Sequence, residues 1–316
     1  MTQTETTSVL DPRKFCDPDL TADGDERAHV GLTKLDTLWF NTGTLCNLEC
    51  VTCYIESSPR NDRLVYLTAD EVAYYLDEIE SENLETREIG FTGGEPFMNP
   101  DIIPMMEDSL RRGFEVLVLT NAMKPMSKCT DELLRLHKLY GAKLTLRVSV
   151  DHYTQQLHEE ERGPRSWGPM LEGLKWLSHH GFHIAAAGRT RWGDDKADLR
   201  QGYGRLFVSE DIAIDADHPA QLVLFPELDD QVDVPEITTA CWGILDQSPD
   251  DVMCASSRMV VRRKGADLPV VLSCTLLPYD EAFEMGTSLA EASAPLKLNH
   301  PHCAKFCVLG GASCSA

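Results

Sequence analysis

Short apolar runs alternate with amphipathic segments along the first two thirds of the chain. Six of these runs are typical of buried strands, because each is short and ends at a polar or glycine-containing segment. They are Thr37–Phe40, Glu88–Phe91, Glu115–Thr120, Lys143–Val150, His183–Thr190 and Gln221–Phe225. Strands that alternate with helices predict right-handed βα units and a parallel sheet. Six units are too few for an eight-stranded barrel, so the pattern predicts an α/β protein with an open sheet or a partial (β/α)6 barrel of the TIM type.

Helices are predicted where apolar residues recur every three or four positions. The first begins near Thr68, because Thr68 and Glu71 fit a capping box. Others are predicted at Ile102–Arg112, Thr130–Leu139 and Trp167–His180. The first 35 residues are polar and rich in turn formers, and they predict an N-terminal arm.

The composition changes after about residue 235. Six of the 11 cysteines lie in the last 76 residues, and two strand-like runs, Arg258–Arg262 and Leu268–Leu272, lie on either side of Gly265. We therefore expect three parts: an arm over residues 1–35, a core over 36–235 and a smaller cysteine-rich region over 236–316.

Charge and composition narrow the possible partners. The 316 residues include 29 Lys and Arg against 51 Asp and Glu, a net charge of -22. A field of this sign repels nucleic acids and anionic membranes, so we expect neither as a partner. No apolar run approaches the roughly 18 residues of a membrane span, and no secretory signal is visible. We expect a cytoplasmic protein, in which clustered cysteines indicate metal or redox chemistry rather than disulfides.

Three cysteines follow the first predicted strand on one short loop. Cys46, Cys50 and Cys53 have the spacing CxxxCxxC. Three thiolates on a tight loop can hold three irons of a 4Fe-4S cube and leave the fourth iron open. Two other interpretations remain: a zinc ion with a distant fourth ligand, or three thiols packed as small apolar side chains.

At this loop the chain resembles the radical S-adenosylmethionine (radical SAM) superfamily. Three features carry the resemblance over residues 36–235: the cysteine loop, Gly93-Gly94-Glu95-Pro96 after the second strand, and the order of the βα units. The resemblance implies a 4Fe-4S cluster whose open iron binds S-adenosylmethionine. It also implies reductive cleavage of that cofactor to a 5′-deoxyadenosyl radical, which abstracts hydrogen from a substrate, with flavodoxin or ferredoxin as reductant.

The resemblance also suggests how the cofactor amino group is bound. Gly93 and Gly94 leave room for a close backbone approach at the end of a strand. By resemblance, Glu95 and nearby carbonyls meet the amino group of S-adenosylmethionine. The alternative is an ordinary Gly-Gly turn in which Glu95 is an acidic residue at a helix N-terminus.

Polar residues after the third and fourth strands are candidates for the rest of the cofactor. By resemblance, Ser149 and Arg162 hold its carboxylate, and Arg suits this role because its guanidinium pairs with both oxygens. The alternative is a capping Ser and a surface Arg. Asn121 is a candidate for the ribose and Asp151 for the ribose or the substrate.

The residue just before the third cysteine is aromatic in many members of the superfamily and is Thr52 here. Tyr54 is the aromatic residue that could replace it at the adenine. Gly188 and Arg189, after the fifth strand, are weaker candidates.

The C-terminal cysteines resemble the twitch or SPASM extensions of radical SAM enzymes. This resemblance implies one auxiliary Fe-S cluster, and the expected ligands are Cys254, Cys274, Cys303 and Cys307, with Cys314 as the alternate. Zinc on the same thiols and simple packing are the alternatives. The cysteines expected to be inert are Cys16, Cys129 and Cys241, and the histidines expected on the surface or in loops are His179, His180, His300 and His302.

Two functions from different classes fit these observations. The first is a radical SAM enzyme that oxidises, cross-links or epimerises a peptide or a small molecule. The 35 residues before the first strand are too short for a winged-helix peptide-recognition domain, which favours a small molecule or a short side chain. The second is a non-catalytic Fe-S or zinc protein of electron transfer or scaffolding. It does not explain the Gly-Gly-Glu-Pro turn or the Ser149 and Arg162 pair.

Overall fold

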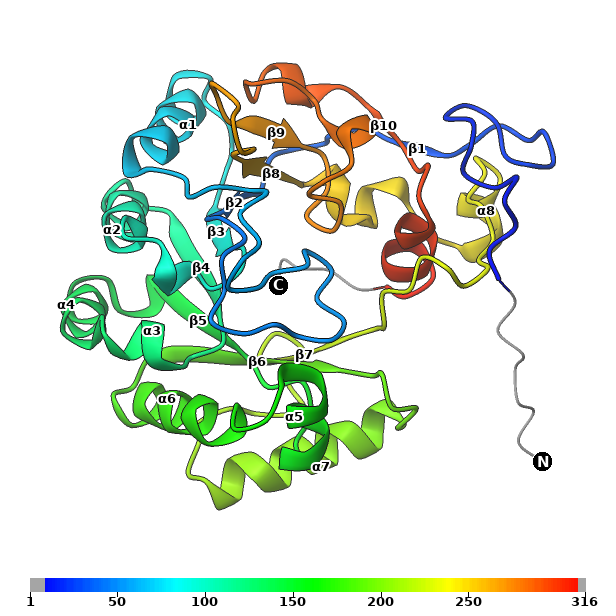
Figure 1. Cartoon of the computed structure of the whole chain (residues 1–316). Helices are drawn as coiled ribbons and strands as arrows, with labels where there is room; N and C mark the ends of the chain where they lie inside the picture. The colour runs from blue at the N-terminus through cyan, green and yellow to red at the C-terminus, as the bar shows by residue number, and fades with distance from the viewer. Residues whose placement is uncertain (1–8, 312–316) are drawn as a thin grey trace, which may run out of the picture.

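One curved sheet of eight strands organises the molecule (Figure 1). The structure is a computed structural model and describes residues 9–311. The strands are β2 (Thr37–Asn41), β3 (Glu88–Thr92), β4 (Glu115–Thr120), β5 (Leu144–Ser149), β6 (His183–Arg189), β7 (Leu222–Phe225), β8 (Ser257–Val261) and β9 (Val270–Leu272). Their order is β7-β6-β5-β4-β3-β2-β8-β9. The six predicted strands are confirmed as a parallel series from β2 to β7, and the sheet is not closed into a barrel, because β7 and β9 are its edges.

Helices cover the outer face of the sheet (Figure 1). They are α1 (Ala69–Ser81), α2 (Ile102–Arg111), α3 (Lys124–Ser127), α4 (Thr130–Tyr140), α5 (Gln155–Arg162), α6 (Trp167–His179) and α7 (Lys196–Ser209). Helix α8 (Cys241–Leu245) lies away from the sheet, beside the N-terminal arm (Figure 1). The predicted capping box is confirmed, since Thr68 accepts from the Glu71 amide and Glu71 accepts from that of Thr68. Helix α5 was not predicted, because its sequence QQLHEEER has one apolar residue and so no periodic signal.

Both faces of the central strands are buried, so their sequences are nearly continuous apolar runs. All five residues of β2 and all five of β3 are buried. Phe40 and Phe91 stack with ring centroids 5.8 Å apart and pack in the cluster that includes Val72 and Leu76 of α1. Trp39 belongs instead to a second cluster, which includes residues of the C-terminal region. The inner face of the sheet is therefore covered by the last third of the chain.

The predicted C-terminal hairpin is confirmed, but it continues the main sheet. Strands β8 and β9 pair antiparallel, and β8 pairs parallel with β2, with Thr37 opposite Ser257 and Phe40 opposite Val260. The physical reason is that the outer edge of β2 would otherwise present unpaired backbone groups. The boundary near residue 235 stays a prediction.

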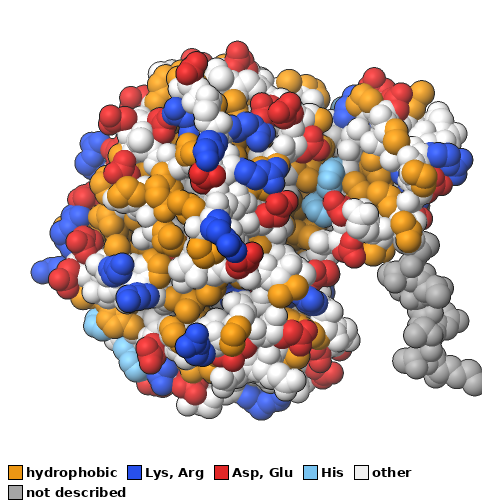
Figure 2. All heavy atoms as spheres, viewed as in Figure 1, with side chains coloured by type: hydrophobic (Ala, Val, Ile, Leu, Met, Phe, Trp, Pro, Cys, Tyr) orange, Lys and Arg blue, Asp and Glu red, His pale blue; other side chains and the backbone are white. Residues whose placement is uncertain are grey.

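The N-terminal arm is packed along the C-terminal region. Strand β1 (His29–Val30) pairs antiparallel with β10 (Leu296–Lys297). Before it, the fully buried Arg27 pairs with Glu236, with 2.6 Å between Nη2 and Oε1. Within residues 9–311, no helix is both long and apolar enough to cross a membrane. Acidic and basic side chains are interspersed over the face seen in Figure 2.

Candidate active site

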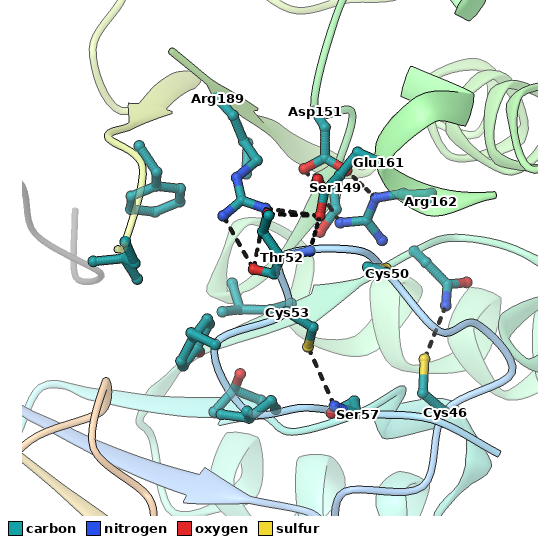
Figure 3. Close-up of a pocket in the computed structure, with 18 of the residues that line it drawn as sticks. Cys46, Cys50, Thr52, Cys53, Ser57, Ser149, Asp151, Glu161, Arg162 and Arg189 are labelled. Carbon is teal, nitrogen blue, oxygen red and sulfur yellow. Dashed lines mark hydrogen bonds and ion pairs between the residues drawn. The ribbon is translucent and has the colours of Figure 1, made fainter. Parts of the chain in front are cut away.

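The three-cysteine loop lies at the carboxyl ends of the parallel strands, where α/β proteins place their sites. Cys46 is buried, Cys50 and Cys53 are half-buried, and all three line one cavity (Figure 3). Backbone amides hold two of the sulfurs: Leu48 N lies 3.4 Å from Cys46 Sγ, and Ser57 N lies 3.3 Å from Cys53 Sγ. Amides directed at sulfur are the contacts that orient thiolate ligands.

Burial controls the protonation of two of these thiols. It raises the pKa of Cys46 to about 12 and that of Cys50 to about 11. Both are therefore protonated at neutral pH when free, and a metal must displace their protons to bind. The donor set, three soft sulfurs on one loop beside an open cavity, fits a cluster with one open iron.

Gly93 and Gly94 make the close approach that the sequence predicts, and its target is the cysteine loop. A Cβ on Gly94 would lie 2.2 Å from the carbonyl oxygen of Leu45, and one on Gly93, whose φ is +132°, would lie 2.5 Å from that of Gly43. Both glycines also line the cavity. They let the end of β3 pass directly beneath the loop, which places the loop over the sheet.

Glu95 is not among the residues that line the cavity, and its expected role at the cofactor amino group stays a prediction. It is buried, and its carboxylate accepts from Thr120 Oγ1 at 2.8 Å and from the Asn121 amide at 2.8 Å. Burial, opposed by these hydrogen bonds, raises its pKa to about 7. Glu95 therefore ties the end of β3 to the end of β4.

Asn121, Ser149 and Tyr54 line the cavity, as the sequence predicts. The side-chain nitrogen of Asn121, Nδ2, donates to Asn47 Oδ1 at 2.9 Å and lies 4.0 Å from Cys46 Sγ. The structure thus brings the third and fourth strand ends to the cysteine loop. The cofactor roles of these residues stay predictions.

Asp151 and Arg162 are brought together as a buried ion pair inside the cavity (Figure 3). Burial raises the pKa of Asp151, but the Arg162 charge outweighs it, so the net pKa lies below the ordinary value. Burial lowers the pKa of Arg162 and the charge of Asp151 raises it, and the net effect is a rise above the ordinary value. Arg162 is therefore not a surface residue, and an anion that reached it would share it with Asp151.

Sequence reasoning missed Glu161 and Arg191, and it ranked Arg189 low. Glu161 is buried and forms ion pairs with both arginines beside Thr52 of the cysteine loop. Glu161 lies in an acidic run of a helix that the sequence did not predict. Nothing in the local sequence distinguishes it from the solvent-exposed acidic residues beside it. Arg189 is the last residue of β6, and its place at the carboxyl end of a predicted strand was the sequence signal for a site residue.

The other end of the cavity is apolar. Phe225 ends β7, Pro226 and Leu228 follow it, and Leu276 and Phe306 come from the C-terminal region. The rings of Phe225 and Phe306 stack with centroids 5.8 Å apart and an angle of 18°. The cavity therefore has a polar end at the cysteines and an aromatic end at β7.

The C-terminal cysteines gather at a second, smaller cavity. Four of them line it, namely Cys254, Cys274, Cys303 and Cys307. Burial raises the pKa of Cys254 to about 11 and that of Cys303 well above its ordinary value. His302 also lines this cavity with 8% exposure, so its expected surface position is wrong. Cys314 lies outside the described residues.

The two cavities share a wall. Leu276 lines both, and Phe306 of the first cavity lies between Cys303 and Cys307 of the second. Among residues 9–311, no three His, Cys, Asp or Glu side chains are grouped closely enough to hold a single metal ion.

Comparison with known proteins agrees with this geometry. Residues 40–189 match the model of the Radical SAM superfamily. AlbA of Bacillus subtilis, an antilisterial bacteriocin subtilosin biosynthesis protein, is 31% identical over 143 residues, which are 45% of this chain and 30% of AlbA. The AdoMet-dependent heme synthase of Methanosarcina barkeri is 28% identical over 43% of this chain and 37% of that protein. The matches thus span about a third of these curated relatives.

Solved structures share the fold. Streptococcus suis SuiB bound to S-adenosylmethionine superposes with a TM-score of 0.58 and 12% identity, over 80% of this chain and 63% of SuiB. SuiB bound to its precursor peptide SuiA gives 0.59. Residues 40–189, the segment that carries the cysteine loop, thus match a radical SAM domain.

Proposed function

We propose that the protein is a radical SAM enzyme that modifies a peptide. The observation that carries the proposal is the shared cavity of Cys46, Cys50 and Cys53, with strand-end polar groups at one end and aromatic side chains at the other. A reductant such as flavodoxin or ferredoxin would supply the electron.

The chain's own residues have separable parts in this proposal. When bound, the cluster and S-adenosylmethionine supply a one-electron cleavage that yields a hydrogen-abstracting radical. The three thiols hold the cluster, the Gly93-Gly94 turn supports the loop, and Arg162 offers positive charge to the cofactor carboxylate beside Ser149. Phe225 and Phe306 keep water from the apolar end of the cavity.

The peptide class is supported by the relatives rather than by one residue. AlbA is named for the biosynthesis of a bacteriocin, and SuiB has been crystallised with a precursor peptide. An apolar wall formed by Phe225, Leu276 and Phe306 also suits a hydrophobic side chain.

We also propose an auxiliary Fe-S cluster on Cys254, Cys274, Cys303 and Cys307. Four thiols at one buried cavity fit the four ligands that such a cluster takes. Its place behind Leu276 and Phe306 would let it exchange an electron with a substrate in the first cavity.

The first experiment measures cofactor cleavage. Anaerobically reconstituted protein with dithionite and S-adenosylmethionine is expected to yield 5′-deoxyadenosine, and Cys50→Ala is expected to yield none above background. Cys16→Ala, at an exposed cysteine outside the site, is the matched control and should keep the wild-type yield. Equal yields from wild type and Cys50→Ala would favour a non-catalytic Fe-S protein.

The second experiment counts iron and sulfide in a variant with Cys46, Cys50 and Cys53 all changed to Ala. Retention of about four irons supports the auxiliary cluster. Loss of all iron would remove it from the proposal, and retention of one zinc instead would assign the C-terminal thiols to a zinc site.

A further inference from the structure

The cysteine loop is fastened at Thr52 to one buried acidic residue. Thr52 lies between Cys50 and Cys53, and both its amide and its hydroxyl donate to Glu161 Oε1, at 3.0 and 2.9 Å. The amide of Val51 donates to the backbone carbonyl of Glu161 at 2.9 Å. Three polar groups of the loop therefore end at a single residue of α5.

Two arginines, Arg189 and Arg191, hold the same contact, and Figure 3 shows the contacts of Arg189 with Thr52 and Glu161. Arg189, at the end of β6, lies 3.0 Å from Glu161 Oε1 and donates to Thr52 Oγ1 at 2.6 Å. It also donates to the Thr52 carbonyl at 3.3 Å. Arg191 pairs with the second oxygen, Oε2. Each oxygen of the carboxylate thus has its own guanidinium.

The burial of Glu161 shows that this network is not an incidental surface contact. The side chain is 1% exposed, and a charge so buried is costly unless it is paired and hydrogen-bonded. Its neighbour Arg162 pairs with Asp151 inside the cavity. The last turn of α5 therefore carries both the anchor of the loop and the arginine of the cavity.

We propose that Glu161, with Arg189 and Arg191, is a positioning residue for the cysteine loop. It fixes Thr52, and with it the placement of Cys50 and Cys53, before any cluster binds. The part of this inference that concerns cluster retention rests on the proposed function. The part that concerns loop order does not, because these contacts are made by side chains and backbone groups of the chain alone.

The first test uses hydrogen–deuterium exchange on metal-free protein. Thr52→Val keeps the shape but removes the hydroxyl, and Glu161→Gln removes the charge. In both we expect amides of residues 46–55 to exchange about tenfold faster, because a hydrogen bond to a charged group is lost. Two control variants should exchange like wild type. Thr52→Ser keeps the hydroxyl, and Glu160→Gln changes an exposed residue on the same turn of α5 as Glu161. Wild-type rates in Thr52→Val and Glu161→Gln would overturn the proposal.

The second test measures the reconstituted cluster. We expect Thr52→Val to release iron to a chelator several-fold faster than wild type and to change the EPR spectrum of the reduced cluster with S-adenosylmethionine, with both restored in Thr52→Ser. Unchanged release and an unchanged spectrum would overturn the role in cluster retention. Should Glu161→Gln fail to fold by circular dichroism, Thr52→Val alone decides. The exchange test stays decisive even if no cofactor is cleaved.

Discussion

At the scale of single residues, burial decides which charges the cavity region can hold. Asp151 and Glu161 are buried, and each carboxylate is paired with at least one arginine, Asp151 with the half-buried Arg162. His158 of α5 is buried, and neither ring nitrogen has a hydrogen-bond partner among residues 9–311. Its edge-to-face contact with Trp167, 5.4 Å between centroids, is a contact that a neutral ring makes well.

His158 makes the stability of the protein depend on pH. Burial lowers its pKa to about 4 from the ordinary value of 6.5. The unfolded chain therefore binds a proton as pH falls below 6.5 while the folded chain does not, so this stabilisation is present above pH 6.5 and is lost between 6.5 and 4. The loss at pH 5 is about 2 kcal/mol.

His158→Phe should remove this part of the pH dependence and keep the aromatic contact. The free energy of unfolding in urea is expected to fall less between pH 7.5 and 5 in the variant than in wild type. His29→Phe, at an exposed histidine, should show the wild-type fall. An equal fall in His158→Phe would contradict the prediction.

Single residues also mark what spacing predicts and what it does not. Cys46, Cys50 and Cys53 are close in sequence, so their common cavity follows from the loop alone. The sequence places Glu95 near the cofactor, but it does not show that this carboxylate accepts hydrogen bonds from Thr120 and Asn121 at the end of β4. The Glu161 network joins three distant segments, and only the fold brings them together.

At the scale of elements, helix α6 packs closely against the segment that directly follows β4. A Cβ on Gly173 of this helix would lie 1.9 Å from the carbonyl oxygen of Ala122. Ala is normally the better helix former by about 1 kcal/mol. At Gly173 the effect of Ala on stability is expected to be unfavourable instead, because neither the helix nor the Ala122 carbonyl can move away cheaply in a packed core.

Gly173→Ala is therefore expected to destabilise the protein by at least about 2 kcal/mol, as overpacking in a core does. Gly168→Ala, in the same helix with nothing within 4 Å, is the matched control and should be neutral or stabilising by up to about 1 kcal/mol. Thermal or urea unfolding measures both. A stabilised Gly173→Ala variant would show that α6 does not press on this strand end.

Elements with strong local signals are the ones that the sequence predicts. Parallel strands buried on both faces have continuous apolar runs, and α1 begins at a capping box, so both types of element were found. Helix α5 is polar and forms because its neighbours pack around it, so its existence was not visible. The pairing of β8 with β2 depends on which edge is free, which no local pattern states.

At the scale of the whole molecule, a buried ion pair joins the first and last thirds of the chain. Arg27 is fully buried against Glu236 and also donates to the Asp17 and Leu20 carbonyls. Removal of one partner leaves the other charge buried and uncompensated, which costs roughly 3–5 kcal/mol.

Arg27→Met is expected to lower the free energy of unfolding by this amount. Lys14→Met removes the neighbouring pair with Asp233, which is 21% and 29% exposed, and should cost no more than about 1 kcal/mol. Urea denaturation of the two variants gives the comparison. Equal losses of unfolding free energy in the two variants would contradict the idea that burial makes the Arg27 pair more important to stability than the exposed pair.

The pairing of β2 with β8 has a consequence for how the protein is made. Strand β2 is complete once residue 41 has left the ribosome, yet the partner for its outer edge is not synthesised until residue 257. During that interval the edge of a strand with an apolar centre, Leu38-Trp39-Phe40, is bare, and bare edges recruit other chains. Nascent or truncated chains that stop before β8 should therefore aggregate or require a chaperone, whereas those that include it should not.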